Sequence, residues 1–396
     1  MKKNIELTNT GAFINEKWKV LNQFFDKPKR KEQLFIVTFL VVIYSVNGQK
    51  SPYPDSPVIK GISLDWSTHR RDALGSDNFQ LTWADDNNLY GSWGDGGGFV
   101  GNDNKACRVS LGFARIEGSG NNWKGYDVWG DPDCARNPAT FNGKSWGTIC
   151  VNKVLYMWLV EGQRQQHRKF VSLARSFDHG ATWEKSDWEF TEHDKVAIPT
   201  FLNFGKNNAK SKDEFVYSYF IQREDTAKMD FAYQKKKKLF LARVHKDSLW
   251  EGRKAFNWYK GLNADVPQWG HIFDRKAVFE DPEGVGWCLS AFYNPGLKRY
   301  ILSTEHTETH KGVMGIFDAP EPWGPWTTVK YWTVDEFFGK TRPGDSLDWG
   351  NNIFFLAFNN KWLSNNGKKF TLNFTGGGKG KDNDSFNTVQ GSFILH

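Results

Sequence analysis

An imperfect repeat of β-strands is the feature that most constrains how this chain can fold. Residues 75–98 contain two strand-like runs, Phe79–Trp83 and Leu89–Trp93, on either side of an Asp-Asp-Asn-Asn turn. Alternating aromatic and β-branched residues around an Asx-rich turn are typical of a β-hairpin. The pattern recurs four more times along the chain. One aromatic residue in each second strand marks the copies: Tyr90, Tyr156, Tyr217, Tyr300 and Phe370.

Each hairpin is followed by a third strand with a recurring sequence. Phe113-Ala114-Arg115, Leu173-Ala174-Arg175 and Leu241-Ala242-Arg243 are near copies of one another. Repeats of antiparallel strands without helices between them indicate an all-β fold, a β-propeller. Five repeats predict five blades, and seven shorter blades are the alternative that the length would also allow. We expect Phe386–Leu395 to complete a blade with Val58–Leu64, which would close the ring and remove exposed strand edges.

The N-terminus has the pattern of an export signal. Basic residues from Lys27 to Lys31 precede a short apolar run, Leu34–Val46, and small residues precede Gln49. This pattern predicts a signal peptide at 1–48 and a single propeller catalytic domain at 49–396, with a signal anchor as the alternative. The mature protein is then exported to the periplasm or secreted. Export permits disulfides, so Cys107 and Cys134 are predicted either to pair or to remain buried thiols.

The net charge of +7 favours an anionic partner. Because no basic run lies on a convincing helix, nucleic acid is excluded as a partner, and we expect a monomer that binds an acidic oligosaccharide or polysaccharide. Without a CxxC or His/Cys cluster, no cofactor and no metal ligand set is predicted. Structural calcium in the Asp/Asn-rich stretches Asp95–Asp103 or Asp382–Asp384 remains an alternative.

The repeat also predicts where chemistry occurs. Within each blade, the start of the first strand and the end of the second meet on one face near the axis, because the two strands are antiparallel. Carboxylates, amides, cations and Trp rings gathered there suit a sugar, through hydrogen bonds to hydroxyls and stacking on pyranose faces. The predicted catalytic residues are Asp77, Asp95, Arg223, His271 and His306. The predicted substrate-binding residues are Lys144, Trp146, Gln163, Arg164, Glu305, Asp348 and Asn351.

One motif marks the fold more sharply. Ser176–Trp183, SFDHGATW, matches the Asp-box SxDxGxTW, and Ser364–Phe370 is a degraded copy. Such boxes shape hairpin turns, so Asp178 and His179 are predicted to have no catalytic role. The motif resembles those of sialidase-like propellers. The pieces TWADDNNLYGSWGDGGG and SAFYNPGLKRYILSTEH resemble propeller proteins of marine polysaccharide-utilisation systems, including those that act on ulvan. The resemblance implies a secreted carbohydrate-active enzyme.

Three functions fit these residues. The first is a carbon–oxygen lyase or dehydratase that eliminates across C4–C5 of a uronate and leaves a 4,5-unsaturated end. Arg223 or Arg164 would neutralise the uronate carboxylate, and His306 or His271 would take the C5 proton. The second is a glycoside hydrolase in which Asp77 and Asp95, or one of them with Glu305, flank the scissile bond. The third is a non-catalytic glycan-binding propeller. The positive charge favours elimination as the leading prediction.

Overall fold

The computed structural model describes residues 50–100, 108–130, 140–161, 170–223, 237–339, 353–376 and 384–396. The chain divides into two units, Met1–Lys50 and Ser51–His396. The predicted signal peptide, and Cys107 and Cys134, lie outside the described residues. All the strands belong to the second unit. Among the described residues, no helix is long and apolar enough to cross a membrane.

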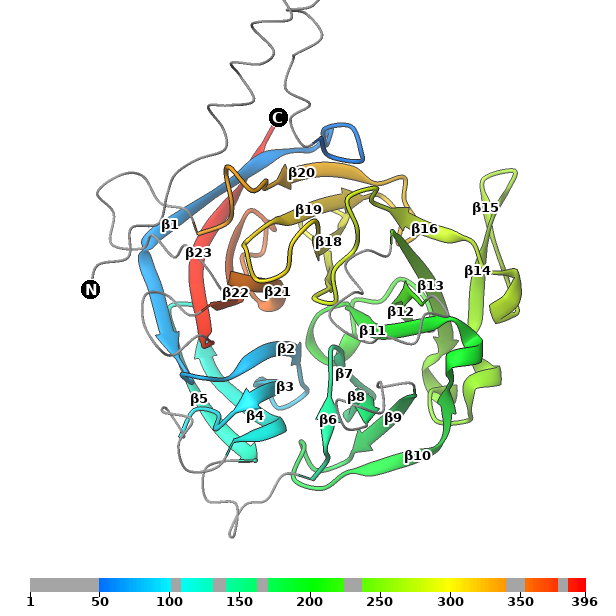
Figure 1. Ribbon diagram of the computed structural model, residues 1–396, viewed down its shortest axis with the longest axis horizontal. Helices are drawn as coiled ribbons and strands as arrows, with labels where there is room; N and C mark the ends of the chain where they lie inside the picture. The colour runs from blue at the N-terminus through cyan, green and yellow to red at the C-terminus, as the bar shows by residue number, and fades with distance from the viewer. Residues whose placement is uncertain are drawn as a thin grey trace, which may run out of the picture. The chain divides into compact units, whose positions relative to one another are not determined.

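The Ser51–His396 unit consists of five antiparallel blades around one axis (Figure 1). Blade one contains β2 (Asp77–Trp83), β3 (Leu89–Gly96), β4 (Val109–Ser119) and β5 (Asn122–Trp129). Blade two contains β6 (Gly143–Lys144), β7 (Thr148–Val151), β8 (Val154–Glu161), β9 (Val171–Ser176) and β10 (Glu184–Phe190). Blade three contains β11 (Val196–Asn203), β12 (Phe215–Gln222), β13 (Lys238–His245), β14 (Asn257–Asn263), β15 (Val266–Gly270) and β16 (Ala277–Glu280).

Blade four contains β17 (Ser290–Asn294), β18 (Arg299–Glu305), β19 (Met314–Ala319) and β20 (Thr327–Tyr331). Blade five contains β21 (Ile353–Leu363), β22 (Lys369–Gly376), β23 (Phe386–Leu395) and β1 (Ile59–Asp72). A short parallel pairing between β11 and β17 joins the strands of blades three and four into one continuous sheet. The all-β, five-bladed prediction is confirmed, and the seven-bladed alternative is not.

The ring closes through the two ends of this unit. The N-terminal strand β1 pairs antiparallel with β23, from Ile59 opposite Leu395 to Asp72 opposite Phe386. In Figure 1 the two strands lie side by side along the outer part of blade five. The predicted closure is confirmed and runs beyond Leu64. Because blade five draws strands from both ends of the unit, closure ties its first and last strands into one sheet.

The innermost strands share a bulge near their first residues. Asn78, Ile198 and Phe355 all have positive φ, at 57°, 45° and 49°. Each lies at a register shift between the first and second strand of its blade. A bulge bends the strand and re-aims the neighbouring side chains. Because three blades repeat it, the strain at Asn78 belongs to the propeller architecture and is not by itself evidence of a site.

Hydrogen bonds between blades fill the axis. The Gln80 side-chain amide donates to the Leu289 carbonyl oxygen of blade four at 2.6 Å. The Thr82 hydroxyl donates to Asn203 Oδ1 of blade three at 2.7 Å. Blades three and four are not the ring neighbours of blade one, so these bonds cross the axis. The innermost strand of blade one, which begins at Asp77, is thus bonded directly to blades three and four.

The recurring Ala-Arg pair of the third strands has a packing role. The three alanines are fully buried. The Arg175 guanidinium lies 4.1 Å from the centre of the Trp250 ring, and that of Arg243 lies 4.1 Å from the Trp269 ring. Arg115 lies 4.9 Å from the Tyr126 ring. Each arginine thus covers an aromatic ring beyond the third strand, a contact worth roughly 0.5–1 kcal/mol where exposed.

The Asp-box forms the predicted turn, between β9 and β10. The Ser176 hydroxyl and the Thr182 backbone N–H both donate to Asp178 Oδ1 at 2.8 Å, and the Gly180 N–H donates to the serine oxygen. The Trp183 ring packs edge-on against Phe113, 4.9 Å away. The degraded copy, Ser364–Phe370, instead connects β21 and β22. It uses a similar serine bond, in which the Lys369 N–H donates to Ser364 Oγ at 2.8 Å.

Candidate functional site

Two carboxylates lie at the open end of the blade-one hairpin. Asp77 begins β2 opposite Gly94, and Asp95 follows Gly94 in β3. This is the shared edge that the antiparallel pairing predicted. Asp77 is buried, with 6% of its surface exposed, whereas the Asp95 side chain is 29% exposed. The two acids therefore meet different environments within one hairpin.

Lys144 of blade two lies between these carboxylates. Its Nζ is 2.5 Å from Asp95 Oδ1, and only 6% of its side chain is exposed. A Cβ at Gly94 would lie 2.4 Å from Asp77 Oδ1 and 2.8 Å from the ammonium, so the two groups face each other across this glycine. Among the described residues the ammonium makes no hydrogen bond of good geometry, so its contact with Asp95 is an ion pair. On the open side, Arg108 Nη2 lies 3.6 Å from Asp95 Oδ2.

The pKa of Asp77 is shifted by its surroundings. Burial raises the pKa of Asp77 to about 7, and the negative charges of Asp95 and Asp384 add to this, while Lys144 opposes it. Asp77 Oδ1 is buried and makes no hydrogen bond among the described residues. At neutral pH, Asp77 is therefore a carboxyl that can hold a proton, next to a carboxylate that is ion-paired with two cations.

A third carboxylate, Glu305, ends β18 in blade four and is fully buried. Its Oε1 accepts a hydrogen bond from the His310 N–H at 2.7 Å, and its Oε2 accepts one from the Thr309 hydroxyl at 3.4 Å. A Cβ at Gly286 would lie 2.7 Å from the Glu305 Cβ, so only glycine fits there. The loop that follows β18 thus folds back over Glu305, the last residue of that strand.

Cys288 connects Glu305 to blade one. Its sulfur lies 3.5 Å from Asn78 Oδ1. Burial raises the pKa of the Cys288 thiol well above its usual value, and the negative charges of Glu305 and Asp77 raise it further. Because the charges of Asp77 and Glu305 both act on this buried sulfur, the two carboxylates lie in one region. We call this region the floor, and it contains Asp77, Asp95, Lys144, Cys288 and Glu305. At neutral pH the thiol stays protonated and is a poor nucleophile.

Trp146, predicted to stack on sugar, is instead enclosed by protein. Its side chain is 1% exposed, and its ring meets Trp287 of blade four edge-on at 5.9 Å. The Trp287 indole N–H donates to the Thr309 hydroxyl at 3.1 Å. The Trp146–Trp287 pair therefore connects blades two and four next to the loop that follows Glu305. Both rings are buried and cannot stack on a sugar in this structure.

Two of the predicted catalytic residues, His306 and His271, lie away from this floor. His306 is fully buried but stacks on Tyr331, because side chains alternate along β18 and that of Glu305 takes the axial side. Arg223 lies at the end of β12 with its Nη2 4.0 Å from Glu192 Oε2. His271 is exposed just beyond β15, at the outer edge of blade three (Figure 1). The four remaining predicted residues lie outside the described residues: Gln163, Arg164, Asp348 and Asn351.

The sequence prediction missed several residues of the floor. Gly94, Cys288 and Thr309 all contribute, and Asp384 acts on Asp77 through its charge. One signal was available for Cys288, which shortly precedes the first strand of blade four, much as Asp77 begins that of blade one. Gly94 carries no signal of its own, because its role depends on a lysine from another blade.

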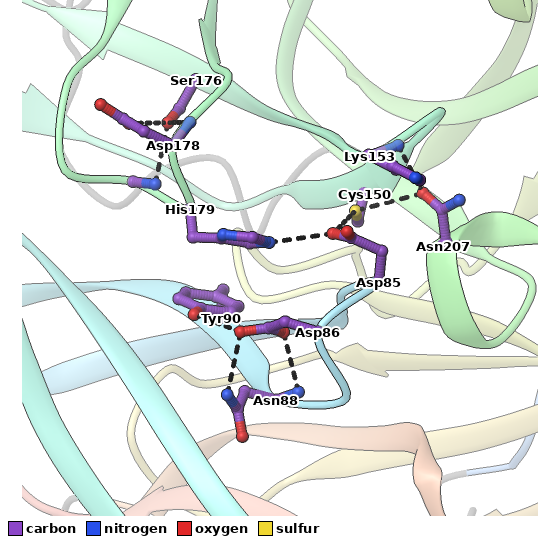
Figure 2. Close-up of polar contacts among 11 residues, drawn as sticks. Asp85, Asp86, Asn88, Tyr90, Cys150, Lys153, Ser176, Asp178, His179 and Asn207 are labelled. Carbon is purple, nitrogen blue, oxygen red and sulfur yellow. Dashed lines mark hydrogen bonds and ion pairs between the residues drawn. The ribbon is translucent and has the colours of Figure 1, made fainter.

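A second polar cluster lies at the opposite, turn end of the strands (Figure 2). His179 of the Asp-box binds Asp85 of the β2–β3 turn, with Nε2 2.9 Å from Oδ1. The Cys150 sulfur lies 3.4 Å from Asn207 Oδ1 and 4.0 Å from Asp85 Oδ1. Burial raises the pKa of Cys150 to about 12, so it is not a reactive thiol. This cluster ties blades one, two and three together.

Metal binding stays open at the loops where it was predicted. In the part of the chain that the structure describes, His, Cys, Asp and Glu side chains form no group of three that could hold a metal ion. Residues 101–103 of the first stretch and 382–383 of the second lie outside the described residues. Calcium there remains a prediction.

Comparison with known proteins gives structural matches only. No protein-family model matches the chain, and no curated protein matches it either. The fold is similar to that of a Bacteroides ovatus protein provisionally named a hydrolase, with a TM-score of 0.52, 12% identity, and 87% of this chain and 97% of that chain covered. At this identity the similarity shows the fold alone.

Two further similar structures are named glycoside hydrolases. RS223-β-xylosidase matches with a TM-score of 0.47 and 12% identity over 81% of this chain and 94% of its own. The α-L-arabinofuranosidase PaAbf62A of Podospora anserina matches with a TM-score of 0.44 and 11% identity over 86% and 94%. These neighbours are named as hydrolases and not as lyases, so the carbon–oxygen lyase prediction is wrong. The prediction of a β-propeller agrees with the similar fold.

Proposed function

We propose that this protein is a glycoside hydrolase in which Asp77 is the proton donor and Asp95 its ionised partner. The observation that carries the proposal is the contrast between the two acids. Asp77 is buried with a raised pKa, and Asp95 is ion-paired with Lys144 at 2.5 Å. Glycoside hydrolysis needs one protonated and one ionised carboxyl group across the scissile bond.

Each residue then has a defined step. Asp77 gives its proton to the glycosidic oxygen as the C–O bond breaks, so the leaving sugar departs as a neutral alcohol. Asp95 takes a proton from water as the water oxygen bonds to the anomeric carbon, or attacks that carbon itself before water replaces it. The Lys144 ammonium holds the Asp95 side chain in place at 2.5 Å and stabilises negative charge near the reacting atoms. Glu305, held by His310 and Thr309 and fully buried, does not contact the sugar but would favour, through its negative charge, the positive charge that develops on the sugar ring in the transition state.

The charges of the described floor favour a neutral sugar. Even with Asp77 protonated, Asp95, Glu305 and Asp384 outnumber Lys144 and Arg108, cations that the structure describes beside them. A uronate would meet carboxylates at short range, where repulsion exceeds the pull of a diffuse positive surface. We therefore propose a neutral glycan as substrate in place of the acidic polysaccharide expected from net charge.

The test is turnover by the full-length protein on a panel of neutral polysaccharides and aryl glycosides. We expect release of reducing sugar, with the Asp77→Asn variant slowed about 10²–10⁴-fold, the usual range for loss of a general acid or base. Asp85→Asn is the matched control, because it changes a carboxylate of the same hairpin at the opposite end. Binding without product would replace the hydrolase with a glycan-binding protein. Equal slowing in both variants would remove Asp77 from the proton-donor role.

A further inference from the structure

A buried acid, phenol and imidazole lie beside the proposed site without taking part in it. Asp281 is fully buried, and the Tyr331 hydroxyl donates to its Oδ2 at 3.0 Å. The Tyr331 ring is stacked parallel on His306, with ring centres 3.8 Å apart and an angle of 3°. These three residues come from the segment after β16, from β20 and from the end of β18. We call them the Asp281 clamp.

The clamp holds the loop that makes the hydrogen bonds to Glu305. His306 directly follows Glu305, and its backbone N–H donates to the Val313 carbonyl at 3.1 Å. The Thr307 N–H donates to the Glu283 carbonyl at 3.0 Å, and the Glu283 N–H donates to Asp281 Oδ1 at 2.9 Å. The loop 306–310 is therefore attached to Asp281 on both sides, through the ring stack and through Glu283.

The loop also contains strained backbone. Thr307 and His310 both have positive φ, at 60° and 61°. A β-branched residue in this conformation persists only where its surroundings hold it there. The strain at His310 orients the N–H that donates to Glu305 Oε1.

We propose that Asp281, Tyr331 and His306 are positioning residues, which fix the 306–310 loop and through it the buried Glu305 carboxylate. This inference rests on the proposed function, because Glu305 is taken to stabilise the positive charge that develops on the sugar. The residues act through the loop and do not touch the substrate themselves. Loosening the clamp should therefore change Glu305 while leaving the Asp77–Lys144–Asp95 cluster in place.

The test combines hydrogen exchange with kinetics on the full-length protein. In Tyr331→Phe, which keeps the ring stack and removes the bond to Asp281, we expect faster amide exchange in the 306–310 segment and a kcat/KM about 10-fold lower. Tyr217→Phe is the matched control, because it removes a comparable bond to Asp213, of 2.7 Å, in the blade-three hairpin. Asp281→Asn keeps an acceptor for Tyr331 and should retain most activity, whereas Asp281→Ala should not.

The Glu305→Ala background separates positioning from general destabilisation. There, Tyr331→Phe should have less than a two-fold further effect on residual kcat/KM, because the carboxylate that it positions is already absent. An equal loss in both backgrounds would overturn the proposal, as would unchanged exchange at 306–310. If the wild-type protein turns over no glycoside, the proposed function fails, and the exchange result still decides whether the clamp holds the loop.

Discussion

Asp77→Asn should make the protein more stable at neutral pH while it removes the proposed proton donor. The pKa of Asp77 is about 7 in the fold, raised by burial from 3.8. Below pH 3.8 the folded and unfolded chains both carry the proton. Between the two values the unfolded chain ionises and the folded chain does not, so the free energy of unfolding falls as pH rises. Asparagine does not ionise and escapes this loss.

The magnitude follows from the shift of the pKa. Raising the pKa by about three pH units costs the folded state about 4 kcal/mol of stability once Asp77 is ionised in the unfolded chain, at about 1.4 kcal/mol per unit. The free energy of unfolding of the Asp77→Asn variant should thus exceed that of the wild type by up to about 4 kcal/mol at pH 7.5. At pH 4.5 the gain should be only about 1 kcal/mol, because this pH lies only slightly above the pKa of the unfolded aspartate. For a unit the size of Ser51–His396, unfolding entropy is roughly 0.7 kcal/mol per kelvin. The expected rise in Tm at pH 7.5 is therefore about 3–6 °C.

Differential scanning calorimetry at the two pH values measures this directly. Asp85→Asn is the control, because it breaks the ion pair with His179 and should not raise Tm. A Tm for Asp77→Asn that is unchanged or lower at pH 7.5 would refute the reasoning. A gain that is the same at both pH values would do so too, because it would not come from ionisation.

Three further predictions follow from the same geometry. The kcat/KM of the wild-type protein should fall above about pH 7, as Asp77 loses its proton, and a pH–rate profile of the free enzyme shows whether this limb exists. Lys144→Met should raise the pKa of Asp77, move that limb to higher pH, and lower kcat/KM about 100-fold through Asp95, measured in the same profile. Gly94→Ala should abolish activity, because its Cβ would lie 2.4 Å from Asp77 Oδ1, and a crystal structure of the variant should show that side chain displaced. A normal kcat/KM for Gly94→Ala would contradict the placement of Asp77.

The fold could be predicted from the sequence because its information is local. Each hairpin alternates apolar and polar residues around its own turn, and the Tyr90 to Phe370 copies repeat that signal. Closure was predictable for a similar reason, since Phe386–Leu395 is a strand that needs a partner. The Asp-box motif correctly predicted the turn that begins at Ser176, between the last two strands of its blade. Its degraded copy at Ser364 lies instead between the first and second strands of blade five.

The site was only partly predictable, because its roles depend on which face each side chain takes. Glu305 and His306 are neighbours in the sequence, and only the axial side of β18 reaches the floor. The Trp146 ring was expected to be exposed for stacking on a sugar, but Trp287 from another blade packs against it. His271 follows an additional outer hairpin that lengthens blade three beyond the repeat. Net charge does not describe the site either, since +7 is a property of the whole chain and the described floor is rich in carboxylates.

The most direct measurement of the proton-donor role of Asp77 compares aryl glycosides whose leaving groups differ in pKa. A dinitrophenolate leaves without a proton, whereas a sugar alcohol needs one. We predict that Asp77→Asn cleaves dinitrophenyl glycosides within about 10-fold of the wild-type kcat/KM, and loses about 10²–10⁴-fold on unactivated glycosides. A loss of the same size on both kinds of substrate would contradict proton donation by Asp77.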